Sequence, residues 1–182
     1  MAKDRIILGA GDLYLAEYSG EIPSDEAIET ELNKIGGIKA GATLEYSAET
    51  LDVSTVYGYL TKEFITKEEA VLKTGIMAIN GENIKKLCAT ARVTEDSSKH
   101  TRTVKIGGVQ NDDGKLYVVR FVHKDAKDGD IRVTIVGKNR AGLTFTFMKD
   151  AESVIDAEFR AYPHDKEGTL ITYVETDPTI AA

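Results

Sequence analysis

The side chains best suited to chemistry in this sequence are three histidines and one cysteine. No two of His100, His123 and His164 stand two or four positions apart, and Cys88 is the sole cysteine. Structural zinc sites use four Cys or His ligands, often in close pairs. The spacing therefore does not favour a metal site, and Cys88 is better interpreted as a small core residue.

Short motifs that resemble ligand-binding loops lack the context that binding requires. Gly9-Ala10-Gly11 has no third glycine at dinucleotide-fingerprint spacing and precedes a strand pattern, whereas phosphate binding needs a helix N-terminus. The segments 112–114 and 128–130 lack the terminal glutamate of a calcium loop and are typical of turns. No Gly-x-Ser-x-Gly elbow is present. We therefore expect no catalytic residue, no enzyme activity and no cofactor.

Composition narrows the class of protein further. The 182 residues include 23 Lys and Arg against 30 Asp and Glu, a net charge of −7, which disfavours a broad nucleic-acid-binding surface. A single cysteine excludes an internal disulfide. No apolar run approaches the roughly 20 residues of a membrane span, and the start lacks a signal-peptide core. We expect one domain over residues 1–182, soluble and made inside the cell.

Period-two alternation of apolar and polar residues is the dominant structural signal. It predicts strands over 131–136, 143–148 and 155–161, each with one buried and one wet face. The short connection at 138–142 predicts that the first two form a hairpin. Other expected strands are 13–18, 43–49, 71–79, 103–106, 117–122 and 169–174.

One helix is expected over 81–91, with Asn80 as its N-cap and an apolar stripe on one side. The acidic segment 24–34 is compatible with a second helix or with a solvated loop. The predicted fold is mainly β: an antiparallel β-sandwich or barrel with one flanking α-helix. Residues 177–182 are expected to form a loose tail.

The segment 50–70 mixes aromatic and aliphatic residues with charges, and strand alternation is lost around 48–52. Such an excursion between two strands can fold back on the core of its own domain. It can equally be buried against another subunit, because exposed apolar patches often mark interfaces.

The order of these segments resembles the tail tube (major tail) proteins of bacteriophages and phage-like particles, over about residues 5–175. The matching stretches are GDLYL at 11–15, IGGIKAGATLEY at 35–46, LKTGIM at 72–77, IGG at 106–108, IDAEFRAYP at 155–163 and GTL at 168–170. They are patterns of turns and strands rather than catalytic signatures.

The resemblance implies a structural subunit of which six copies form a ring, with rings stacked into a hollow tube that conducts DNA. It implies that the excursion, at about 48–72, contacts a neighbouring subunit. The interface candidates are Val56, Tyr57, Tyr59, Leu60, Phe64 and Ile65. Expected partners are further copies, other tail proteins (terminator, tape measure, baseplate or tip) and DNA as transient cargo, with no membrane. The expected location is a virion tail or tail-like particle, made in the bacterial host cytoplasm.

A DNA conduit must not hold the phosphates that pass through it, which fits an acidic chain. Candidates for a polar face on the lumen are Thr144, Thr146, Asp156 and Glu158. An ordinary solvated outer face explains the same residues equally well.

Two other functions remain open from the sequence. One is the inner tube of a contractile injection or secretion device, whose sheath would be a separate chain. The other is a β domain that binds a small molecule or carbohydrate, against which the absence of Trp counts mildly.

Overall fold

The computed structural model describes residues 11–55, 58, 61–126, 129–145, 149–150 and 152–177, with the side chain of residue 40 excepted. Within them, seven antiparallel strands form one sheet in the order β1-β6-β7-β8-β3-β2, and β9 also pairs with β7. The strands are β1 (Asp12–Glu17), β2 (Ile38–Ser54), β3 (Thr61–Ile76), β6 (Tyr117–His123), β7 (Ile131–Asn139), β8 (Ile155–Ala161) and β9 (Ile171–Glu175). The predicted mainly β, antiparallel fold is confirmed.

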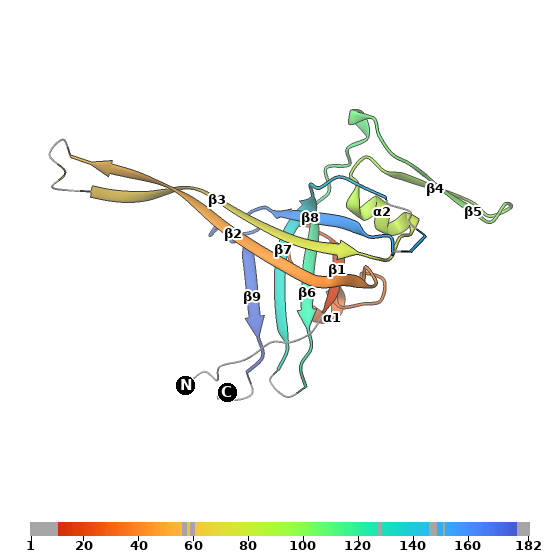
Figure 1. Cartoon of the computed structure of the whole chain (residues 1–182), viewed down its shortest axis with the longest axis horizontal. Coiled ribbons are helices and arrows are strands. Elements are labelled where there is room, and N and C mark those ends of the chain that lie inside the picture. Colours follow the sequence, from red (N-terminus) through yellow and green to blue (C-terminus); the bar gives the residue numbers. More distant parts are fainter. Residues whose placement is uncertain are drawn as a thin grey trace.

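The sheet folds over on itself at β7, because this strand has different partners along its length. Residues Ile131–Ile135 pair with β9, whereas Gly137–Asn139 pair with β8. As Figure 1 shows, β2, β3 and β8 consequently cross over β1, β6, β7 and β9 as a second layer. A Cβ atom at Gly137 would lie 2.1 Å from the carbonyl oxygen of Arg160. The strand can switch partners there because glycine lets the backbones approach so closely.

The main core lies between the two layers and joins most elements of the fold. Its fully buried side chains come from alternate positions of the strands, which is what alternation in the sequence predicts. They include Leu13, Leu15, Leu72, Ile76, Val119, Ile135, Ile155 and Phe159. β6 is buried along nearly its whole length between β1 and β7, and this matches its apolar sequence.

Gly137→Ala should destabilise the protein by about 1–3 kcal/mol, because the added methyl group overlaps the Arg160 carbonyl at the fold of the sheet. Chemical denaturation would measure the loss. Gly37→Ala is the matched control, since a Cβ there meets nothing within 4 Å. Equal stability of the two variants would contradict the importance of this close approach.

A second, smaller core covers the opposite face of β6 and β7, and ion pairs fix the segment that closes it. Helix α1 is only Asp25–Ile28, so most of the acidic segment 24–34 is not helical. Its Ile28 is fully buried beside Val118 and Val136. These apolar contacts and the charges beside them hold α1 against the sheet.

The ion pairs join α1 and its C-cap to two guanidinium groups on the sheet, that of the buried Arg120 and that of the mostly buried Arg132. Arg120 on β6 contacts Asp25 at 2.5 Å and donates to the Thr134 hydroxyl at 2.9 Å. Arg132 on β7 donates to a Glu29 carboxylate oxygen at 2.6 Å. This hydrogen bond raises the pKa of the Arg132 guanidinium, so the charged pair is maintained.

Glu29→Gln should cost about 1–3 kcal/mol of unfolding free energy, because two mostly buried arginines lose the less exposed of the two carboxylates that they share, the other being Asp25. Thermal melts at neutral pH would measure it. Glu31→Gln, an exposed change two residues away, should leave the melting temperature nearly unchanged. An equal effect of the two would contradict a specific role for Glu29.

Helix α2 (Gly81–Leu87) flanks the sandwich and ends earlier than the expected residue 91. Asn80 caps it as predicted, since its side chain accepts a hydrogen bond from the Asn83 amide at 2.8 Å. The buried Asn83 side chain donates to the carbonyls of Ile35 and Ala78, which ties α2 to the chain beside β1. No described helix has the length and apolar character needed to span a membrane.

Two findings differ from the predicted strands. β4 (Arg92–Asp96), which pairs with β5 (Thr101–Lys105) in a separate hairpin, was not expected because its composition is mixed and polar. The hairpin of 131–136 with 143–148 is wrong. Instead, Lys138 and Asn139 extend β7 along β8, and the described residues 143–145 form no strand. The Asn139 side chain accepts from the Glu158 amide and donates to Leu87 and Gly142 carbonyls, replacing the expected turn.

Candidate assembly surface

An arm of two strands projects far beyond the sheet. β3 pairs with β8 only over Val71–Ile76, yet it pairs with β2 along its whole length. Residues 47–54 and 61–69, which we call the arm, therefore extend past β8 as an isolated antiparallel pair (Figure 1, left). At about 3.3 Å per residue, nine residues of β3 reach roughly 30 Å from the sheet.

The arm occupies the segment in which the sequence predicted an excursion. The sequence predicted an excursion between strands at 43–49 and 71–79, whereas β2 runs without interruption through 48–52 and β3 begins at Thr61. Alternation disappears because every described position of β2 from 43 to 54 is exposed, and no face has to be apolar. The predicted interface residues Val56, Tyr57, Tyr59 and Leu60 lie outside the described residues. Phe64 and Ile65 lie on the arm and are exposed, not packed on the core as the first interpretation would require.

A bulge at Thr66 divides the arm into two parts. Glu49 pairs with Lys67 and Thr50 with Ile65, so Thr66 has no partner residue, and its hydroxyl donates to the Glu49 carbonyl. The extra residue increases the local twist of the ladder. Just before the bulge, the directly opposed Glu49 and Lys67 form an ion pair, whereas beyond it the opposed residues include the apolar pair Leu51 and Phe64 and the acids Asp52 and Glu63.

One face of the outer part of the arm is apolar and open to solvent. Leu51 lies directly opposite Phe64, and Val53 opposite Lys62, whose ammonium group is 4.8 Å from the centre of the Phe64 ring. Leu51 is 55% exposed and Phe64 44% exposed. We call Leu51, Val53 and Phe64 the apolar arm face. Ile65, opposite Thr50, lies on the other face.

Ion pairs fix the base of the arm on the same side as the apolar arm face. Lys67 contacts Glu49 at 2.5 Å and Lys73 contacts Glu45 at 2.8 Å. Hydrogen bonds to these glutamates raise the pKa of both lysines. Because all four groups are largely exposed, the pairs orient the strands more than they stabilise the fold.

Two of the four lumen-face candidates lie on the same face of the sheet as the Lys73–Glu45 ion pair. Asp156 and Glu158 are the exposed residues of β8, and Glu158 lies opposite Lys73 of β3. The Glu158 charge also contributes to the raised pKa of Lys73. Thr144 is exposed but lies outside any strand, and Thr146 lies outside the described residues. The acids therefore share their face with cations.

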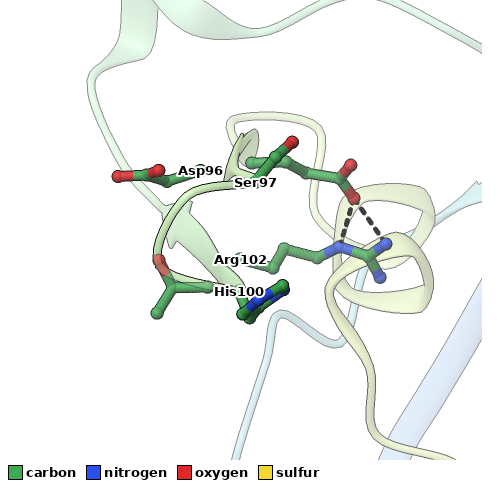
Figure 2. Close-up of a pocket in the computed structure, with 6 residues that line it drawn as sticks. Asp96, Ser97, His100 and Arg102 are labelled. Carbon is green, nitrogen blue, oxygen red and sulfur yellow. Dashed lines mark hydrogen bonds and ion pairs between the residues drawn. The ribbon is translucent and has the colours of Figure 1, made fainter.

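A hairpin of β4 and β5 projects at the other end of the molecule (Figure 1, right). The shallow depression at its tip is lined by Glu95, Asp96, Ser97, His100, Thr101 and Arg102 (Figure 2). Arg102 donates through Nε to a Glu95 carboxylate oxygen at 2.7 Å, so the positive and negative charges of this ion pair offset each other.

The residues singled out for chemistry lie in separate parts of the fold. His100 is at the tip of the β4–β5 hairpin, His123 is buried on β6, and Cys88 is the C-cap of α2, 3.5 Å from the Thr90 hydroxyl. In the described part of the chain, no three His, Cys, Asp or Glu side chains are grouped as metal ligands.

Comparisons with known proteins give similarity only at the level of solved structures. No protein-family model matches the chain, and no curated protein matches it. One similar chain comes from the virion of a native gene transfer agent particle, with 11% identity, a TM-score of 0.42, and coverage of 90% of this chain and 95% of that one. Another comes from the tail of an empty gene transfer agent particle with C6 symmetry, with 12% identity, a TM-score of 0.38, and coverage of 89% and 95%.

The arm should be dispensable for folding of the single chain. Replacing residues 50–66 by Asn-Gly would join Glu49 to Lys67, which lie opposite each other, through a turn suited to a hairpin. We expect a melting temperature within a few degrees of the parent, because the removed described side chains are exposed. Circular dichroism melts would test this. A large loss of stability would show that the outer arm belongs to the core.

Proposed function

We propose that this protein is a structural subunit that assembles with copies of itself into six-membered rings, stacked as the hollow tail tube of a phage or phage-like particle. The tube serves as a conduit for DNA, and the chain carries out no catalysis. The sequence resemblance suggests the class, and the arm is the observation that carries the proposal.

The arm supports assembly because it is poorly suited to a lone chain. A two-stranded ribbon is marginally stable in water without an apolar face to bury. This arm holds Leu51, Val53 and Phe64 on one face, each about half exposed. Burial of such side chains contributes about 25 cal/mol per Å² of apolar surface. A neighbouring copy that covers the apolar arm face would stabilise both the arm and the assembly.

Unpaired strand edges offer a second means of association. Among the described strands, β2 is an edge strand that pairs only with β3, and β9 is an edge strand that pairs only with β7. β9 also exposes Tyr173 and Val174, which are 54% and 46% accessible. The edge of β1, in contrast, is covered by the chain at 33–35. Two different free edges permit pairing from copy to copy around a ring, which would also remove an aggregation hazard.

The charge pattern is compatible with a passage for DNA. The outer face of β3 and β8 carries Asp156 and Glu158 beside Lys73 and Arg160, so it is mixed in sign. Such a face does not supply the clustered cations that hold phosphates through counterion release. If it lines the lumen, DNA can slide past it. Other tail proteins would cap and nucleate the tube, and the particle would be built in the bacterial host cytoplasm.

Leu51→Ser with Phe64→Ser should abolish rings and filaments while leaving the subunit folded, because both side chains are exposed in the single chain. Light scattering after size exclusion, and negative-stain microscopy at rising concentration, would follow assembly. Leu32→Ser, at a residue 90% exposed outside the arm, is the matched control and should assemble normally.

One result would contradict the proposed assembly, and another the role of the apolar arm face in it. Parent protein that stays monomeric at every concentration, with or without a tail extract as nucleus, and binds a sugar or metabolite tightly would favour a ligand-binding domain. Normal tubes from the double variant would show that the apolar arm face is not an interface.

A further inference from the structure

The outer arm carries two acids that face each other across the ladder. Asp52 lies directly opposite Glu63, and both side chains are exposed. Directly opposed residues of an antiparallel pair lie on the same face with Cβ atoms about 5 Å apart, and like charges there are destabilising. Within the described residues, neither carboxylate has a cationic partner, whereas Glu45, Glu49 and Glu69 at the arm's base all have one.

The β4–β5 hairpin carries the opposite arrangement. Arg92 lies directly opposite Lys105, and both are exposed. Among the described residues, the Arg92 guanidinium donates a hydrogen bond to one acceptor, the neutral carbonyl of Gly107, at 3.4 Å. In the described part of the chain, neither cation contacts a carboxylate, although Arg102 of the same hairpin pairs with Glu95.

The faces that carry the two pairs also match in chemistry. Beside Asp52 and Glu63, the arm presents the hydroxyl groups of Ser54 and Thr61. Beside Arg92 and Lys105, the hairpin presents the exposed Thr94 and Thr103. The other face of the hairpin is turned toward α2, since Val104 and Arg102 lie against Gly81. The cationic face is therefore the one left open.

Net charge follows the same division over the two projections. Residues 43–69 contain six acids and two lysines, whereas residues 92–106 contain four Lys or Arg and two acids. Figure 1 shows the arm and the β4–β5 hairpin at opposite ends of the long axis. A copy displaced along this axis brings its hairpin toward the arm of the first.

We propose that the Asp52–Glu63 pair on the arm of one copy binds the Arg92–Lys105 pair on the β4–β5 hairpin of a second copy. The contact neutralises two like-charge pairs that each copy alone leaves exposed. It joins different surfaces, so it repeats head to tail and sets the direction and register of assembly. The inference rests on the proposed self-assembly and adds the surface that receives the arm.

Exposed ion pairs are individually weak, about 0–1 kcal/mol each, and are screened by salt. This contact consequently contributes order and specificity more than affinity, which the apolar arm face supplies. Assembly should be faster and more regular at about 50 mM salt than at about 500 mM, because the Debye length falls to roughly 4 Å at the higher concentration, about one ion-pair distance.

Two charge-reversed proteins test the contact. The first carries Asp52→Lys with Glu63→Lys, and the second carries Arg92→Glu with Lys105→Glu. Each alone should need about tenfold more protein to assemble at low salt, because its arm and hairpin now repel each other. An equimolar mixture should recover assembly, since each arm then meets a hairpin of opposite charge. Recovery also shows that both variants are folded. Lys85→Glu, on the exposed side of α2, is the control and should assemble like the parent.

Carbodiimide cross-linking gives a readout that does not depend on complete tubes. In a mixture of ¹⁴N- and ¹⁵N-labelled parent protein, we expect light–heavy peptides that join Asp52 or Glu63 to Lys105. Parent tubes with no such cross-link, or a mixture of reversed variants that fails to recover, would overturn the contact and leave the proposed function standing. Parent protein that forms neither tubes nor any light–heavy cross-link would overturn both.

Discussion

The structure depends on one shared strand. β7 pairs with β9 along its first half and with β8 along its second, and Gly137 lets the chain of β8 approach within van der Waals distance there. Because the sheet folds at this point, the apolar sides of both layers meet and bury a common core. α2 and the α1 segment then close the remaining faces, one through buried amide hydrogen bonds and the other through ion pairs.

The arm is a consequence of the same geometry. β8 is only seven residues long, so it supports β3 over Val71–Ile76 and no further. β2 and β3 continue past this point with only each other as partners. The ion pairs at the base orient the arm, and the outer part presents an apolar face on one side and the opposed acids Asp52 and Glu63 on the other. A surface of this kind gains stability from a partner that a single chain does not supply.

The acidic residues of this chain have different roles in different parts of the fold. Near α1, acids are partners of buried arginines and stabilise the fold. On the outer face of β3 and β8 they alternate with cations and make a mixed surface. On the two projecting hairpins, like charges are opposed across each ladder, negative on the arm and positive on the β4–β5 hairpin, and there the net charge of −7 says little about the local sign.

The sequence by itself determined the class of fold, the positions of most strands and the Asn80 cap, because alternation and capping depend on neighbours along the chain. It also indicated an unusual segment near 50–70. Only tertiary structure decided that Lys138 and Asn139 extend a strand instead of turning, since their partner, β8, lies about twenty residues away. It likewise decided that Asp52 opposes Glu63 and Arg92 opposes Lys105, because register between strands is set by packing and, in the arm, by the bulge at Thr66.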